Sequence, residues 1–142
     1  MLVVLALVGL MASAIVLTLP KDKSVFERDV EALTVRLNQF SEMSIIHSSP
    51  KAFGVDEDGY VFFTFNNSKW DIAFDSSWPN GVQIVIEMDG LPVEIPRKAE
   101  PMIVFETTGL SNSFALNLLD EDEIFDVTSD GKGVFSWTER DT

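Results

Sequence analysis

Few side chains in this sequence have the types and spacing that chemistry requires. His47 is the single histidine and cysteine is absent, so a catalytic triad or a His/Cys metal site lacks its usual members. Near the end of a helix, a positive charge on His47 would suit the carbonyl ends. Asp56, Asp58 and Gly59 match part of a calcium loop, but the later ligands and the closing glutamate are missing. We interpret these three residues as a tight turn.

Two further groups of residues deserve a functional and a structural interpretation. The acidic run Asp120–Glu123 could bind a hard cation or a basic partner, although carboxylates in a hairpin loop are usually solvated charge. Trp70, Trp78 and Trp137 favour packing in or beside a core over a ligand platform, because two of them lie in alternating segments. Glycine-rich phosphate loops are absent. We therefore expect no enzymatic activity, no metal and no cofactor.

The chain begins with an apolar stretch, residues 1–19. Sixteen of its 19 residues are apolar and none is charged, and as a helix it would be about 28 Å long, the thickness of a bilayer core. A cleaved signal would need a basic region before the apolar run, so we favour a retained transmembrane helix. Its expected helix-packing residues are Leu2, Leu5, Gly9, Ala12, Ser13 and Val16, with the small residues allowing close approach.

An amphipathic helix is expected to continue through residues 20–49, with a kink at Pro20 because proline removes an amide donor. Apolar residues recur at steps of three and four. This stripe, which we expect to form the core between helix and sheet, consists of Phe26, Val30, Leu33, Leu37 and Phe40. The opposite face, with Lys23, Glu27, Glu31, Asn38 and Glu42, is expected to contact water. Ser48 to Pro50 should end the helix.

Residues 50–142 alternate short apolar segments with turn residues, which is typical of an antiparallel β domain. The eight expected strands are Tyr60–Phe65, Lys69–Phe74, Val82–Met88, Leu91–Ile95, Met102–Glu106, Ser113–Leu119, Ile124–Ser129 and Val134–Glu139. In the first hairpin, the residues expected to point inward are Val61, Phe63 and Phe65, and those expected to share a face are Trp70, Ile72 and Phe74. The sequence thus predicts an α+β fold in which a long N-terminal helix packs on two antiparallel sheets.

The charge is concentrated in this β domain. Residues 1–50 carry a net charge of −1 and residues 51–142 carry −12, which together make the −13 of the whole chain. A surface this acidic repels phosphate backbones, so nucleic acid is not an expected partner. The absence of cysteine excludes disulfides and does not distinguish an oxidising from a reducing compartment.

These residues resemble a known family. The run MLVVLALVGLMASAIV is similar to the N-terminal helix of type IV pilins and type II secretion pseudopilins. The segments FGVDEDGYVFFTFNNSKWDIAF, WPNGVQIVIEMDG and PMIVFETTGLSNSFALNL, with the closing Asp-Gly hairpin, resemble the general secretion pathway protein H family, the minor pseudopilins of type II secretion. The basic leader, glycine, aromatic residue and glutamate that open this family are expected upstream of Met1, where a prepilin peptidase would act.

The resemblance implies a structural protein of an export filament. It implies a single-pass inner-membrane protein with its head in the periplasm, a methylated mature N-terminus, and assembly with other minor pseudopilins and the major pseudopilin. Such a subunit would help to initiate or cap the pseudopilus during export of folded proteins across the outer membrane. Two alternatives remain open: a minor pilin of a type IV pilus, and a membrane-anchored binding domain or enzyme.

Overall fold

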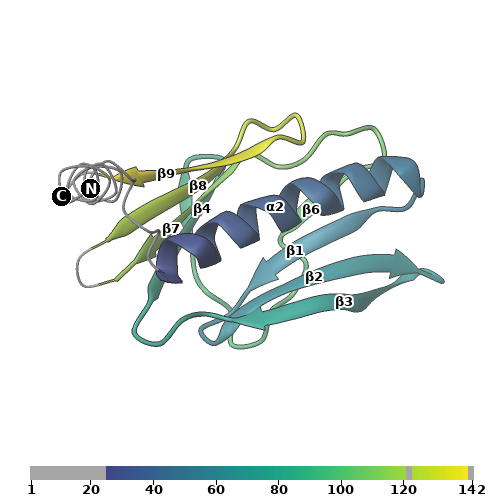
Figure 1. Cartoon of the computed structure of the whole chain (residues 1–142). Coiled ribbons are helices and arrows are strands. Elements are labelled where there is room, and N and C mark those ends of the chain that lie inside the picture. Colours follow the sequence, from purple (N-terminus) through teal and green to yellow (C-terminus); the bar gives the residue numbers. More distant parts are fainter. Residues whose placement is uncertain (1–24, 121–122, 141–142) are drawn as a thin grey trace, which may run out of the picture.

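The computed structural model describes residues 25–120 and 123–140. Within these ranges the chain forms one helix, α2 (Val25–Ile46), followed by nine strands (Figure 1). The expected transmembrane helix 1–19, its packing residues Leu2, Leu5, Gly9, Ala12, Ser13 and Val16, and the expected kink at Pro20 lie outside the described residues.

The strands form two separate antiparallel sheets. Their bounds are β1 (Lys51–Val55), β2 (Gly59–Asn66), β3 (Lys69–Ser77), β4 (Gln83–Met88), β5 (Leu91–Val93), β6 (Ile103–Phe105), β7 (Phe114–Leu119), β8 (Ile124–Ser129) and β9 (Phe135–Arg140). One sheet has the order β3-β2-β1-β6 and the other has the order β5-β4-β7-β8-β9. The predicted α+β fold with two antiparallel sheets is confirmed. Strand β1 is additional to the eight expected strands.

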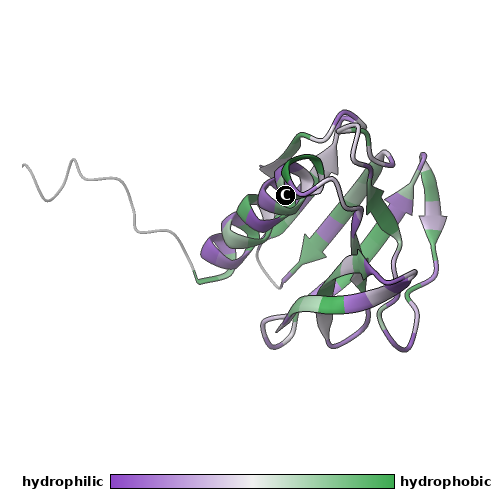
Figure 2. Ribbon diagram, turned by 90° about the vertical axis from the view of Figure 1, so that its right-hand side faces the viewer, coloured by the Kyte–Doolittle hydropathy of each residue, from purple (hydrophilic) through white to green (hydrophobic). Residues whose placement is uncertain are grey.

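Helix α2 lies across both sheets and contacts β1, β6, β8 and β9 (Figure 1). In Figure 2 hydrophilic and hydrophobic residues alternate around the helix, and hydrophobic residues lie on the strands beneath it. The exposed fractions of the stripe residues are 6% for Phe26, 1% for Val30, 1% for Leu33, 0% for Leu37 and 9% for Phe40. These side chains share one core cluster with residues of both sheets. The helix is thus the element that joins the sheets.

The helix ends with a local hydrogen-bonded cap. The Ser49 amide donates to the Ser44 carbonyl at 3.1 Å and the Ser48 amide donates to the Ile45 carbonyl at 3.2 Å. This pair of bonds is a Schellman arrangement, and it requires a left-handed residue at Ser48, whose φ is 49°. The predicted end of the helix at this serine pair is therefore correct, and the chain turns directly into β1.

The alternation expected in β2 is wrong. Tyr60 and Phe62 face the helix, where the Phe62 ring stacks on Phe40 with centroids 4.3 Å apart. Phe63 is buried, but by the alternation of the strand it lies on the opposite face of the sheet. Phe65 is 39% exposed. Side chains on both faces of β2 are buried, and a periodicity of two does not then identify the inward face.

A bulge explains why the face expected for β3 is also wrong. Phe62 pairs with Phe74, but its neighbour Phe63 pairs with Ile72, which leaves Ala73 without a partner. The extra residue reverses the alternation of β3 at this point. Consequently Phe74 packs against the core, whereas Ile72 is 61% exposed.

Tight turns close two hairpins between strands that the sequence predicts. Asn67 and Ser68 join β2 to β3 with φ values of 51° and 64°, and Asp89 and Gly90 join β4 to β5 with φ values of 53° and 81°. Two successive left-handed residues are the mark of the type I′ turn, whose twist suits an antiparallel hairpin. These turns fix the register of the strands on either side.

Candidate partner-binding surface

One side of α2 faces solvent. Val35 is 49% exposed on this side. A shallow groove runs along it, lined by Arg28, Glu31, Ala32, Val35, Arg36 and Gln39. This face combines an exposed aliphatic side chain with charges of both signs, in contrast to the buried stripe.

Beside this groove, a cleft of about 170 Å³ opens between the two sheets beneath the N-terminal half of α2. Its apolar walls come from Phe26, Val30 and Leu33 of the helix, and from Trp78 and Leu118 across the cleft. Trp78 follows β3 of the first sheet and Leu118 belongs to β7 of the second sheet. The cleft therefore lies where the sheets diverge and the helix bridges them.

Arg36 is the cationic side chain of this cleft. Its Nη1 donates a hydrogen bond to the Tyr60 hydroxyl at 3.0 Å. Its Cζ atom lies 4.4 Å from the centre of the Phe74 ring, a geometry that holds a guanidinium by cation–π attraction. Among residues 25–120 and 123–140, Arg36 has no ion-pair partner. The guanidinium is thus positioned by two aromatic side chains and keeps donors for an acceptor outside the chain.

The turn at Asp56 closes one end of the first sheet. One oxygen of the Asp56 carboxylate accepts from the amides of Asp58 and Gly59, each at 2.8 Å, and the other accepts from the Ala99 amide at 3.2 Å. The Asp56 carbonyl accepts from the Trp78 indole at 3.0 Å. The structure confirms a tight turn here. All three bonds to the carboxylate come from backbone amides, so this side chain stabilises the turn.

The other residues considered from the sequence lie apart from the cleft. His47 is exposed in the turn that follows the helix. Trp70 packs edge-on against Phe65 and Trp137 packs edge-on against Phe125. Of the acidic run, residues 121–122 lie outside the described residues. Within the described ranges, no group of three or more His, Cys, Asp or Glu side chains is placed to hold a metal ion.

Asn38 does not face water as expected. Its Nδ2 donates to the Phe135 carbonyl and its Oδ1 accepts from the Phe135 amide, both at 2.9 Å. The side-chain amide therefore pairs with the edge of β9 as a neighbouring strand would. Sequence periodicity missed this role, because asparagine on a polar helix face usually indicates solvent contact.

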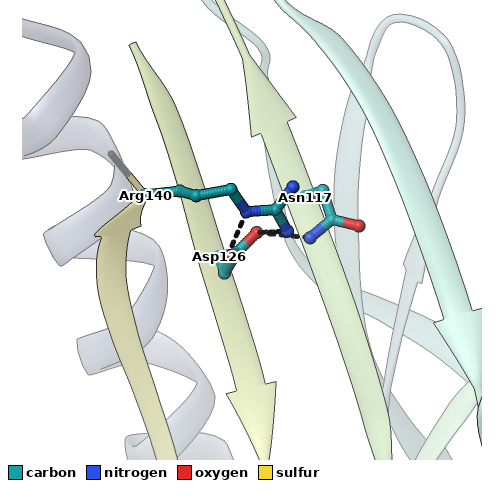
Figure 3. Close-up of polar contacts among 3 residues, drawn as sticks. All are labelled: Asn117, Asp126 and Arg140. Carbon is teal, nitrogen blue, oxygen red and sulfur yellow. Dashed lines mark hydrogen bonds and ion pairs between the residues drawn. The ribbon is translucent and has the colours of Figure 1, made fainter. Parts of the chain in front are cut away.

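A polar cluster joins three strands on the outer face of the second sheet (Figure 3). Asn117 of β7 and Arg140 of β9 both donate to Asp126 of β8, and the two Arg140 bonds are 3.0 Å and 2.8 Å long. The Arg140 side chain is 53% exposed and that of Asp126 is 18% exposed. These bonds run across neighbouring strands, so the cluster ties β7, β8 and β9 together.

A second exposed apolar group lies around the C-terminal end of α2. Ile46 is 74% exposed, Val134 is 59% exposed and Leu110 is 53% exposed. The loops that carry Leu110 and Val134 meet, since the Ser111 amide donates to the Gly131 carbonyl at 3.2 Å. This group is on the far end of the head from residue 25 (Figure 1).

Solved structures resemble this chain, although no protein-family model and no curated protein matches its sequence. Two are structures of the minor pseudopilin EpsH from the type 2 secretion system of Vibrio cholerae. They show 16% and 14% identity, TM-scores of 0.67 and 0.69, 82% coverage of this chain, and 98% and 96% coverage of their own. The solution structure of E. coli GspH shows 14% identity, a TM-score of 0.59, 78% coverage of this chain and 85% of its own.

Among the described residues, no helix is both long and apolar enough to cross a membrane. The similarity to these solved structures extends over most of this chain at low sequence identity. The chain therefore has the pilin-like α+β fold of the minor pseudopilin EpsH and of GspH.

Proposed function

We propose that this chain is a minor pseudopilin, a structural subunit of the type II secretion pseudopilus. Residues 1–19 would anchor it in the inner membrane as a single span, with the head in the periplasm. It would assemble with other minor pseudopilins and with the major pseudopilin, and help to initiate or cap the filament. The fold of the head and the apolar composition of residues 1–19 support this proposal.

The observation that carries the proposal is the burial of the helix stripe. Leu33 and Leu37 are 1% and 0% exposed, and the stripe packs against both sheets. A helix held in this way cannot shift without moving the head. A filament subunit needs this coupling, because helices that bundle in the filament core must carry their heads with them. A membrane-tethered binding domain has no such need.

Charge suggests which neighbours the head accepts. The whole chain has a net charge of −13, so contacts between copies are opposed by like-charge repulsion, most strongly at low salt. Subunits with complementary charge should be preferred. This supports a minor position in a mixed assembly rather than a filament built from this chain alone.

Single-cysteine crosslinking in the native membrane tests the proposal, because the chain has no cysteine of its own. Gln39→Cys places a thiol on the exposed side of α2, and Leu37→Cys, which is buried, is the matched control. We expect Gln39→Cys to crosslink to other pilin-like subunits and Leu37→Cys not to crosslink. Deletion of the gene should abolish export of the folded substrates, and restoring the full chain should recover it.

Two results would contradict the proposal. Export that is unaffected by the deletion would remove the secretion role. Crosslinks from Gln39→Cys to pilus subunits only, with loss of pilus assembly in the deletion strain, would assign the chain to a type IV pilus instead.

A further inference from the structure

We infer that the cleft beneath α2 is a docking site for one segment of a different, less acidic subunit. That segment would insert a single apolar side chain between a basic residue, which faces Asp29, and an acidic residue, which pairs with Arg36. The inference rests on the proposed function, because the partner is taken to be another pilin-like subunit.

The size of the cleft limits what enters it. Its volume is about 170 Å³, and an apolar protein cavity of about 150 Å³ accommodates benzene. The cleft therefore has room for one side chain of the size of leucine or phenylalanine. Its walls, which include Phe26, Leu33 and Trp78, supply apolar contact on the helix side and on the sheet side.

The two charged residues of the cleft set the polarity of the occupant. Asp29 and Arg36 both line it and are seven residues apart on α2, so they lie on the same side of the helix, about 10 Å apart along its axis. Asp29 is exposed. An apolar residue flanked by a base and an acid would satisfy both ends and the apolar walls at once.

Arg36 gives the cleft its specificity. The guanidinium is held by the Tyr60 hydroxyl and the Phe74 ring, so little further side-chain entropy is lost when a carboxylate binds. A chain with a net charge of −13 offers many carboxylates, yet none of those in the described ranges is paired with this arginine. A positioned cation without an internal partner is suited to an external acid. A second copy of the chain is disfavoured by its own charge.

The test uses a photo-crosslinker attached to a single cysteine in the full chain, in membranes that contain the other subunits. Ser77→Cys places the probe, benzophenone maleimide, at the wall of the cleft. Asn80→Cys is the matched control, because Asn80 is exposed nearby but is not part of the lining. We expect Ser77→Cys to capture one segment of another pilin-like subunit that contains an apolar residue close to an Asp or Glu.

Charge reversal then tests the recognition. We expect Arg36→Glu to lower the Ser77→Cys crosslink yield by about tenfold or more, and Arg36→Lys to lower it less. Replacing the captured partner's acid by lysine should restore the yield with Arg36→Glu. If Arg36→Glu does not fold, the same partner substitution in the unaltered chain should lower the yield, and Asp29→Lys should also lower it.

Several results would overturn the inference. These are equal yields from Ser77→Cys and Asn80→Cys, a crosslink to a second copy of the chain, a captured segment without an acid, or a yield that charge reversal leaves unchanged. If Gln39→Cys still crosslinks to pilin-like subunits in such a case, the docking site fails and the proposed function stands. If it does not, the function itself fails.

Discussion

Replacing Asn38 by alanine removes both hydrogen bonds that attach the helix to the edge of β9. Each bond is 2.9 Å long, and a typical hydrogen bond contributes about 0.5 to 1.5 kcal/mol to stability. The two together predict a loss of about 1 to 3 kcal/mol in the free energy of unfolding. The upper part of this range is favoured because Phe135 is only 3% exposed and water reaches its freed backbone groups poorly.

Urea unfolding of the full chain in detergent, followed by tryptophan fluorescence, measures this loss. Gln39→Ala is the control, because Gln39 is exposed next to Asn38 and its substitution should change the free energy by less than about 0.5 kcal/mol. Hydrogen exchange gives a local reading. The Phe135 amide should exchange faster in Asn38→Ala and remain protected in Gln39→Ala.

Asn38→Asp separates the donor from the acceptor. A carboxylate still accepts from the Phe135 amide but cannot donate to the Phe135 carbonyl, whereas a protonated carboxyl can do both. The folded state then favours the protonated form, so the pKa of this aspartate should be raised above its usual value of about 3.9. The resulting stability is present below the unfolded pKa and is lost as the pH rises through the folded pKa.

The free energy of unfolding of Asn38→Asp should therefore fall further below that of the unaltered chain as the pH rises from about 4 to about 7. A pH-independent difference would refute the assignment of the donor. A loss for Asn38→Ala no larger than that for Gln39→Ala, with unchanged exchange at Phe135, would refute the whole account of the helix-to-strand link.

Three further predictions test other parts of the fold. Leu37→Ala should cost about 2 to 5 kcal/mol because Leu37 is fully buried, whereas Val35→Ala should change little; equal effects in urea unfolding would contradict the buried stripe. Gly54→Ala should fail to fold or lose several degrees in melting temperature, since a Cβ there would collide with an overlying backbone carbonyl; an unchanged melt would show that this chain segment is free to move. Arg140→Ala should cost no more than about 1 kcal/mol, because its ion pair with Asp126 is half exposed, and the cost measured by urea unfolding should shrink at high salt.

The sequence was sufficient to predict what depends on regular periodicity. The helix stripe recurs at steps of three and four, and its residues from Phe26 to Phe40 are buried as such a pattern requires. The Asp89-Gly90 turn follows from the left-handed conformations that these two residues tolerate. The two-sheet architecture follows from many short strands separated by turn residues.

The sequence did not predict the features that depend on contacts between distant parts of the chain. Strand β1 is buried along its entire length, with Phe53 in the helix-facing core and the Glu100 backbone close above Gly54 on the other side. A strand that is covered on both faces has no alternation to detect. The bulge at Ala73 and the hydrogen bonds between Asn38 and Phe135 also leave no mark in the spacing of apolar residues. The cleft is formed by α2, β3 and β7, whose lining residues are far apart in the sequence and are brought together only by the fold.

The order of strands in the two sheets determines when the head can fold. The chain leaves the first sheet after β3, returns to it for β6, and completes the second sheet only with β7, β8 and β9. Lys51 of β1 pairs with Phe105 of β6, and Gln83 of β4 pairs with Leu119 of β7. Each of these pairs can form only when the later strand is present. Partners this far apart give a high contact order and slow folding. A chain that emerges from its N-terminus onward therefore exposes apolar strand edges until most of it is through, and holdase chaperones should engage it during that interval.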